Sequence, residues 1–320
     1  MKTSIITGGA GFIGSRLAQR LIQRGDIVYV LDDLSTGYER NVPEKAVFFK
    51  VDVSDPGRIR ELDLPGKADT VYHFAGQSSG EASFDDPSGD IDRNYRATYN
   101  MLVASEQMNA KRFIYSSSMS VYGDVDRSAP MVPEDYECNP ASYYGCNKFA
   151  SEKFINVFAK HSHIKPTIFR FFNVYGPGQN MKNMKQGMLS IYMSYLIRDI
   201  PVTVKGSLDR FRDFIYIDDL LDAVVDCEES ERTFYETFNL GTGIKTTVSR
   251  LLEALLNVFG KGDFDKWVIV EGNTPGDIKG FVADMAKLKA RMEWSPVYKI
   301  EDGIKEMKKW VDETVDLWKD

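Results

Sequence analysis

Hydrophobic and polar positions form two alternating patterns along the first 175 residues. Short apolar runs, typical of buried strands, are Ser4–Thr7, Ile27–Asp32, Val47–Val51, Thr70–Phe74, Arg112–Ser116 and Thr167–Phe172. Between them lie stretches with helical spacing, of which the clearest are 92–109 and 143–160. This alternation predicts a parallel sheet covered by helices, so we expect a doubly wound α/β fold of the Rossmann type.

The pattern loosens beyond residue 175. A loop precedes a predicted helix at 188–197 and short strands around 202–204, whereas 214–228 and 238–240 look like returns to the first sheet. We therefore expect a first domain at 1–175, with return segments near 214–240, and a smaller α/β lobe at 176–320. The last predicted element is a half-exposed helix from Glu301 to Trp318.

The turn after the first strand is rich in glycine. Gly8, Gly11 and Gly14 follow a strand and open a helix. Glycines at this spacing allow a tight turn, a close approach of backbone to a pyrophosphate, and close packing of helix on strand. The context predicts a dinucleotide site with the phosphates at the helix N-terminus, although an ordinary strand-to-helix turn is the alternative.

Asp32 ends the second predicted strand. A carboxylate at this place accepts hydrogen bonds from the adenosine ribose and repels a 2′-phosphate. Residues 33–37 contain no arginine that could hold such a phosphate. The sequence therefore predicts NAD rather than NADP, unless Asp32 is only a helix cap.

Composition narrows the class of protein. The chain has 320 residues, 43% hydrophobic and 27% charged, which is ordinary for a soluble globular protein. Its net charge of −7 argues against a nucleic-acid partner. The three cysteines share no metal-ligand spacing, so we expect no metal site. With a strand directly after Met1 and no long apolar run, we expect no membrane segment and a cytoplasmic location.

Tyr144 and Lys148 are the sharpest candidates for catalysis. Four residues apart on a predicted helix, they share one face, and an ammonium beside a phenol favours the phenolate, a general base for a hydroxyl group. The alternative is a surface ring stacked on a lysine stem. Ser116–Ser118 follow a predicted strand end, where α/β sheets bind ligands, and a serine there could share the proton with Tyr144. A serine-capped polar loop is the alternative.

These stretches together resemble the extended short-chain dehydrogenase/reductase family, in particular its NAD-dependent nucleotide-sugar epimerase/dehydratase group, over nearly the whole chain. The matching stretches are 7–14, 52–53, 73–76, Asn94, 116–123, 144–148, 170–177 and 212–219.

The resemblance implies roles for individual residues. The catalytic set would be Ser118, Tyr144 and Lys148. The coenzyme would contact Gly8, Gly11, Phe12, Ile13, Gly14, Asp32, Asp33, Asp52, Val53, Phe74, Ala75, Gly76, Asn94, Ser116, Tyr144, Lys148 and Phe171. The substrate would contact Ser118, Asn173, Met188, Arg212 and Asp277. For Arg212, a structural ion pair with Asp209 or Asp213 is the alternative, and Lys182 and Lys185 could add positive charge or be simply solvated.

The resemblance also separates possible reactions. Sugar 4,6-dehydratases of the group carry an acidic pair where this chain has Met119 and Ser120, so dehydration is disfavoured. What remains is a UDP-hexose 4-epimerase working through a transient 4-keto sugar. A nucleotide-sugar 4-dehydrogenase or 4-ketoreductase, with a UDP- or GDP-sugar, is the first alternative, and a noncatalytic NAD-binding regulator is the second.

Two positions in the second lobe bear on which nucleotide sugar would bind. Thr274 stands where an arginine is typical, which leaves the nucleotide base open. Phe281 occupies the place that gates the sugar pocket, where a bulky ring would disfavour an N-acetyl group. The resemblance further implies a homodimer formed through helices 92–109 and 143–160, unless their apolar positions face the chain's own sheet.

Overall fold

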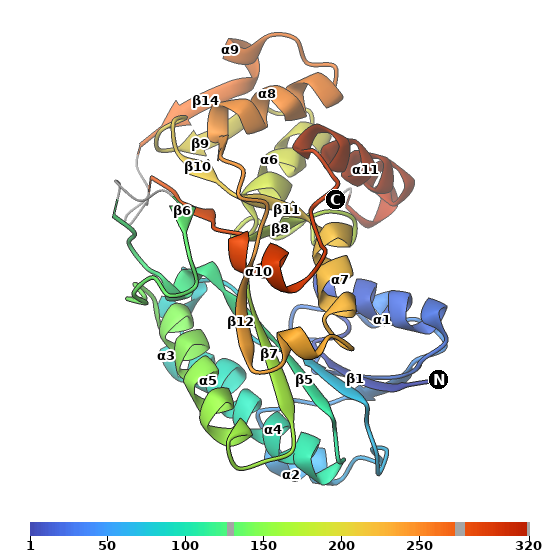
Figure 1. Ribbon diagram of the computed structural model, residues 1–320. Helices are drawn as coiled ribbons and strands as arrows, with labels where there is room; N and C mark the ends of the chain where they lie inside the picture. Colours follow the sequence, from blue (N-terminus) through green and yellow to red (C-terminus); the bar gives the residue numbers. More distant parts are fainter. Residues whose placement is uncertain (127–130, 273–278, 319–320) are drawn as a thin grey trace. The chain divides into compact units, whose positions relative to one another are not determined.

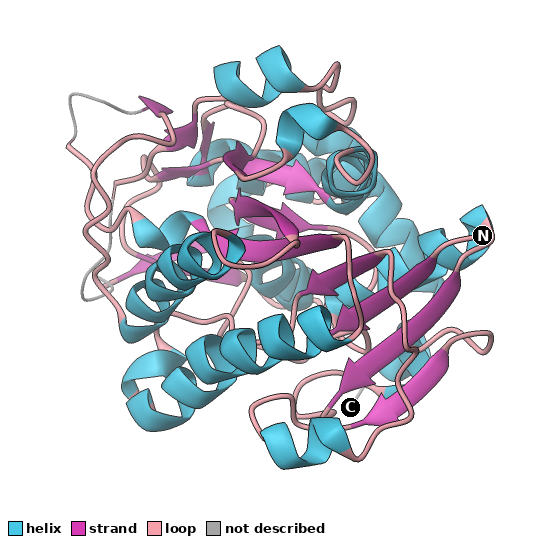
Figure 2. Ribbon diagram, turned by 60° about the horizontal axis from the view of Figure 1, so that its bottom comes forward, coloured by secondary structure: helices cyan, strands magenta, loops and turns pink. Residues whose placement is uncertain are grey.

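The computed structural model describes residues 1–126, 131–272 and 279–318. A seven-stranded sheet contains, in spatial order, β12 (Glu236–Leu240), β7 (Lys165–Phe171), β5 (Arg112–Ser118), β4 (Thr70–His73), β1 (Thr3–Thr7), β2 (Ile27–Asp32) and β3 (Val47–Lys50). The pairings from β5 through β3 are parallel. Figure 2 shows these strands side by side with helices packed against them. The predicted Rossmann-type fold is therefore confirmed.

The order of the strands creates a ligand position at the carboxyl edge. From the central β1 the chain goes first to β2 on one side and then to β4 on the other, and Thr7 aligns with Leu31 in β2 and with His73 in β4. Because parallel strands end together, the loops after β1, β2, β4 and β5 leave the sheet at one edge. This is the place where doubly wound sheets bind ligands.

Helices α1 (Phe12–Arg24), α4 (Ala97–Gln107) and α5 (Tyr143–Ala159) pack on this sheet (Figure 1). Leu17 and Leu21 of α1 are fully buried. Met101 of α4 and Ile155 of α5 join Phe113 of β5 in one core cluster. Apolar packing of helices from three different parts of the chain thus holds the sheet in place.

The chain forms two compact units. The first comprises Met1–Gly123, Glu137–Arg170 and Ala223–Phe238; the second comprises Asp124–Tyr136, Phe171–Asp222 and Asn239–Asp320. The remaining elements of the first unit are η1 (Glu39–Asn41), α2 (Pro56–Arg60), η2 (Ala82–Phe84), α3 (Pro87–Asp90), η3 (Ile91–Arg96), η4 (Met119–Val121) and η5 (Glu231–Thr233), and α7 (Ile217–Asp226) runs from the second unit into the first.

The second unit is built from short strand pairs and helices. Its pairs are β10 (Phe211–Arg212) with β13 (Thr246–Thr247), β11 (Phe214–Tyr216) with β8 (Asn173–Tyr175), β14 (Val268–Glu271) with β9 (Val202–Lys205), and β15 (Val282–Ala283) with β6 (Met131–Val132). Its helices are α6 (Met188–Ile197), α8 (Val248–Val258), α9 (Phe264–Trp267), α10 (Ala286–Arg291), α11 (Ile300–Glu313) and η6 (Val315–Leu317).

Three predicted elements differ from the structure. Strand β11 at 214–216 pairs with β8 and not with the central sheet, whereas 236–240 does join that sheet. The helix expected at 92–109 begins as the π-helical turn η3 before α4. The C-terminal α-helix ends at Glu313, because the chain turns at Thr314 and brings Trp318 to 5.3 Å from the ring of Trp310.

A buried ion pair links α5 to β7. Glu152 Oε2 lies 2.8 Å from Arg170 Nη2, Glu152 Oε1 accepts from Arg170 Nε at 3.0 Å, and both side chains are almost fully buried. Arg170 Nη1 also donates to the Tyr122 hydroxyl at 2.9 Å, and the Ser117 hydroxyl donates to Glu152. These interactions connect α5 and β7 to Ser117 of β5 and to Tyr122, the residue that follows η4.

We predict that Glu152→Ala lowers the free energy of unfolding by about 3–5 kcal/mol, because Arg170 would be left as an uncompensated buried charge. Asp312→Ala is the matched control, since it breaks the exposed Lys308–Asp312 pair on α11 and should cost at most about 0.5 kcal/mol. Urea unfolding followed by circular dichroism measures both. Equal losses in the two variants would contradict the structural role assigned to the buried pair.

Candidate functional site

The turn between β1 and α1 is shaped by backbone contact. Gly8 has φ of +71°, and a Cβ there would lie 2.7 Å from the backbone nitrogen of Ala75. A Cβ on Gly14 would lie 2.2 Å from the carbonyl oxygen of Gly8. Only glycine fits either position, so the turn and the loop after β4 are in direct backbone contact.

Helix α1 begins after Gly11 with its first turn open. Among the described residues, no side chain caps the helix at Gly11. The first backbone N–H groups of a helix need acceptors, and the helix dipole makes them a favourable place for an anion. The open turn, bounded by glycines, fits the pyrophosphate of a dinucleotide. Gly11, Phe12 and Ile13 form this end of the helix.

Asp32 lies at the end of β2 and is 7% exposed. Its Oδ2 accepts from the backbone of Ala10 at 2.9 Å and its Oδ1 from Leu34 at 2.8 Å. Burial raises the pKa of Asp32, while the two backbone hydrogen bonds oppose the rise. Each oxygen keeps a second acceptor position, so the carboxylate is oriented by backbone and can still accept from a ribose hydroxyl.

The other predicted coenzyme residues flank the same edge. Thr7 Oγ1 accepts from the backbone of Phe74 and of Ala75 at 3.2 and 3.1 Å, which fixes the start of the 74–76 loop. Farther along the sheet, Val53 is buried and Asp52 is exposed, while the Asp33 carboxylate accepts from Ser35. The buried Phe171 ends β7.

Tyr144 and Lys148 lie in the first turns of α5 and are 7% and 4% exposed. The Ser142 side chain accepts from Gly145 and caps the helix, which places Tyr144 in its first turn. Lys148 Nζ donates to the carbonyl of Ser116 at 2.9 Å and lies 5.9 Å from the centre of the Tyr144 ring. The alternative of a surface ring on an exposed lysine stem is wrong, because both residues are buried.

The Tyr144 phenol contacts the Ser118 hydroxyl, which favours the phenolate. Burial nevertheless dominates and raises the pKa of Tyr144 to about 12, and the charge of Asp90 acts in the same direction. Burial also lowers the pKa of Lys148 to about 8. The expectation that the ammonium brings the pKa of the phenol down toward working pH is therefore wrong, because desolvation of the phenol outweighs the attraction.

The serines after β5 have separate partners. Ser116 Oγ donates to the carbonyl of His73 at 3.3 Å. Ser118 Oγ accepts from the backbone of Ser120 at 3.1 Å and caps η4, so the capped-loop alternative describes part of its environment. Its contact with Tyr144 is compatible with that cap, because a hydroxyl both donates and accepts.

Asn94 lies in the π-helical turn η3, close to Lys148. Its Nδ2 donates to the carbonyl of Gln77 and to Asp90, each at 3.1 Å. A Cβ on Gly76 would lie 2.5 Å from Asn94 Oδ1 and 3.5 Å from Lys148 Nζ. Asp90 itself escaped the sequence analysis, because no local pattern distinguishes it from the solvated acids at 85, 86 and 92.

The predicted substrate residues of the second unit occupy several elements. Asn173 begins β8 and donates through Nδ2 to the carbonyl of Asp213 at 3.0 Å. Met188 begins α6, and Arg212 ends β10 and donates to the carbonyl of Phe211 at 2.7 Å. Asp277 and Thr274 lie outside the described residues.

Two further features of this unit bear on the predictions. The buried Asp213 carboxylate accepts from the backbone of Thr242, Gly243 and Ala283 and from the Thr242 hydroxyl, which gives it a role in holding these loops. Phe281 is 2% exposed, and its ring lies 5.9 Å from that of Phe172 in an edge-to-face contact.

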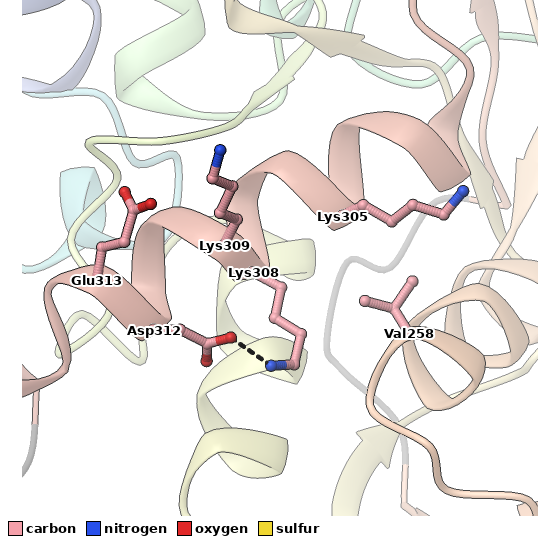
Figure 3. A pocket seen from close by; sticks show the side chains of 6 residues that line it. All are labelled: Val258, Lys305, Lys308, Lys309, Asp312 and Glu313. Carbon is pink, nitrogen blue, oxygen red and sulfur yellow. Dashed lines mark hydrogen bonds and ion pairs between the residues drawn. The ribbon is translucent and has the colours of Figure 1, made fainter.

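A surface pocket between α8 and α11 contains none of the predicted site residues (Figure 3). It is lined by Val258, Lys305, Lys308, Lys309, Asp312 and Glu313. Lys308 pairs with Asp312 at 2.6 Å. Three lysines and two acids of α11 line the pocket together with Val258 of α8, and none of these residues was predicted to bind coenzyme or substrate.

Two absences apply to the described part of the chain only. No helix there is both long and apolar enough to cross a bilayer. Nor do histidine, cysteine and acidic side chains gather there in a group able to hold a metal.

Comparisons with known proteins agree with this geometry. Residues 4–241 match the model of the NAD dependent epimerase/dehydratase family. UDP-glucose 4-epimerase of Mycolicibacterium smegmatis is 31% identical, over 94% of this chain and 96% of its own length.

Solved structures give the same result. UDP-glucose 4-epimerase of Thermotoga maritima with UDP-glucose superposes with a TM-score of 0.92 at 31% identity, covering 98% of this chain and 99% of that one. The Thermus thermophilus UDP-glucose 4-epimerase complex with NAD gives a TM-score of 0.86 at 30% identity, covering 97% and 99%. The sequence-based resemblance and its NAD coenzyme are confirmed, and this chain belongs to the NAD-dependent epimerase/dehydratase family.

Proposed function

We propose that this chain is an NAD-dependent nucleotide-sugar 4-epimerase that acts on UDP-hexoses. The observation that carries the proposal is the buried Tyr144–Lys148 pair on α5, with Ser118 at the phenol, at the sheet edge that also holds the glycine turn. The relatives named UDP-glucose 4-epimerase, from three organisms, support the reaction and the substrate class.

Each residue of the pair has a separate task. Tyr144 takes the proton of the sugar C4 hydroxyl and returns it, and Ser118 shares a hydrogen bond with the same oxygen. Lys148 provides positive charge that favours the phenolate and also binds the nicotinamide ribose. Bound NAD supplies the acceptor and donor of the C4 hydride. The reactive form has Tyr144 ionised and Lys148 protonated, so activity should fall on both sides of a pH optimum. Burial raises the pKa of Tyr144 to about 12 and lowers that of Lys148 to about 8.

The remaining coenzyme contacts follow from the β-strand ends. Gly11, Phe12 and Ile13 bind the pyrophosphate with backbone N–H groups, and Asp32 and Asp33 bind the adenosine ribose. Asp52 and Val53 hold the adenine, and Phe74–Gly76, Asn94, Ser116 and Phe171 line the rest of the coenzyme. These assignments place the coenzyme on the domain at 1–175 with its return segments.

The lobe at 176–320 binds the nucleotide sugar in this proposal. From this lobe Arg212 contacts the diphosphate, Met188 brings the N-terminus of α6 and Asp277 completes the set. Asn173, just before the lobe begins, also contacts the diphosphate. The sugar must turn over between the two hydride transfers, so most binding energy comes from the nucleotide and the diphosphate. We further propose a cytoplasmic location, in line with a coenzyme and substrate of central carbohydrate metabolism.

Tyr144→Phe should lower kcat by roughly 10²- to 10⁴-fold, because it removes the proton acceptor while keeping the ring. Tyr143→Phe is the matched control: this neighbour is 48% exposed and should leave kcat unchanged. The assay is proton NMR of UDP-glucose and UDP-galactose interconversion without added coenzyme. Stoichiometric accumulation of NADH with a 4-keto sugar would instead identify a 4-dehydrogenase, and full turnover by Tyr144→Phe would contradict the assignment.

Asp32→Asn should weaken NAD binding about tenfold, the loss expected for one charge-assisted hydrogen bond, and should narrow the preference for NAD over NADP because the repelling charge is gone. Asp263→Asn, which keeps an exposed N-cap on α9 outside the predicted coenzyme residues, is the control. Isothermal titration calorimetry gives the Kd of each variant for NAD and for NADP, and so the preference between the two coenzymes. An unchanged preference would show that Asp32 does not face the ribose.

We also propose a homodimer through α4 and α5. Tyr99 on α4 is 46% exposed and Val157 on α5 is 57% exposed, and the rings of Tyr95 and Tyr99 each contact Phe154 edge to face. A two-fold axis can bury such a self-complementary patch of two adjacent helices, and a second copy is the occupant that matches it.

Val157→Glu should convert the dimer to a monomer, because it places a charge in the apolar contact of both copies. Ile269→Glu, at a residue of similar exposure on β14, should leave the assembly unchanged. Sedimentation velocity gives the mass of each variant. A monomeric wild-type chain, or a dimer that survives Val157→Glu, would contradict the proposed interface.

A further inference from the structure

Asp90 is a fully buried carboxylate at the end of α3. Within the described residues, no lysine or arginine nitrogen lies within 4 Å of it, so it has no direct ion pair. A carboxylate in this position is costly unless it is hydrogen-bonded and balanced by a charge nearby. Asp90 therefore needs groups that donate hydrogen bonds to its oxygens and a nearby cation that balances its charge.

Two neutral amides hold the Asp90 carboxylate. Asn94 Nδ2 donates to Oδ1 at 3.1 Å, and Asn147 Nδ2 donates to Oδ2 at 2.7 Å. The two donors come from η3 and α5, and Asn147 directly precedes Lys148. Each oxygen thus has a fixed partner, and the carboxylate is tied to the turn of α5 that carries the lysine.

The other charges around this point are already balanced or absent. Glu152 is paired with Arg170, and Asp86 with Arg93 at 2.7 Å. His73, which faces Tyr115 of β5, is kept neutral because burial lowers its pKa to about 3. Tyr115 and Tyr144 are neutral phenols whose pKa values are raised by burial. Among the described residues of this cluster, the remaining cation is the ammonium of Lys148.

We propose that Asp90, locked by Asn94 and Asn147, is a positioning residue that supplies the balancing negative charge for the buried Lys148 ammonium. The proposal rests on the proposed function only where activity is the readout.

The direction of the effect follows from the charges. Burial lowers the pKa of Lys148 to about 8, and the charges of Asp90 and Glu152 oppose this fall. Without Asp90 the lysine would lose its proton at a lower pH. The same charge raises the pKa of Tyr144, so its removal would also let the phenol ionise at a lower pH. Both titrations should move down together.

A matched pair of double variants separates charge from hydrogen bonding. Asp90→Asn with Asn147→Asp reverses the donor and acceptor between the two positions and keeps one carboxylate. Asp90→Asn with Asn147→Ser also leaves an acceptor for the new amide at position 90 but removes the charge. In both, Asn94 keeps an acceptor, so the pair differs in the charge at position 147.

The readout is the titration midpoint of Lys148, followed by NMR of the full chain labelled with ¹³C at lysine Cε and assigned with Lys148→Arg. We expect a midpoint near pH 8 in the wild type. It should fall by roughly 1 unit in the uncharged variant, the shift typical of losing one nearby opposite charge, and return toward the wild-type value in the charged variant. Equal midpoints in all three proteins would overturn the proposal.

Folding and activity give the remaining outcomes. If the charged and the uncharged variants both fail to fold, the fold requires the side chain at position 90 itself and not its charge, and the proposal is wrong. If only the uncharged variant fails to fold, the negative charge is what the buried ammonium requires, and the proposal stands. If the lysine midpoint moves as expected, the proposal stands whether or not UDP-hexoses are epimerised. Where they are, both limbs of the kcat/KM profile should shift to lower pH in the uncharged variant only.

Discussion

The burial of one ammonium group, that of Lys148, is the constraint on which the candidate site depends. A charge inside a protein must be hydrogen-bonded and balanced, or it is neutralised. Here Lys148 Nζ donates a hydrogen bond to the carbonyl of Ser116 at 2.9 Å and lies 4.9 Å from the centre of the Tyr115 ring. The end of β5, the start of α5 and the turn η3 lie around this group. Tyr144 lies one helical turn before Lys148 on the same helix, α5.

Two buried carboxylates, Glu152 and Asp90, lie near that ammonium group and have different roles. Glu152 is satisfied by Arg170 and joins α5 to β7, so its removal should cost stability. Asp90 is held by two amides and has no direct ion pair among the described residues, so its charge reaches the Lys148 and Tyr144 pair. The distinction between a paired and an unpaired carboxylate separates the framework of the site from its electrostatics.

Most of the fold and the outline of the site could be predicted from the sequence because their signals are local. A strand pattern, the glycines at 8, 11 and 14, and Asp32 mark the β1–α1–β2 unit, and the structure has Gly8 and Gly14 in backbone contacts that exclude a side chain. Tyr144 and Lys148 share a face because helical spacing requires it.

What could not be predicted depends on partners distant in the sequence. The pairing of β11 with β8, the π-helical turn around Asn94 and the turn that brings Trp318 against Trp310 are set by tertiary contacts. The nearby lysine predicts a lowered pKa for Tyr144, but burial raises it. The degree of burial could not be predicted from the spacing of the two residues. Asp90 was missed for the same reason.

The central claim is that this site removes a hydride from C4 of a nucleotide sugar and returns it to the same carbon. The most direct test is epimerisation of UDP-glucose carrying deuterium at C4, in ordinary water, with the product analysed by NMR and mass spectrometry. The account predicts UDP-galactose that retains the deuterium at C4. Loss of that label to solvent would contradict it, because the hydrogen would then have left as a proton.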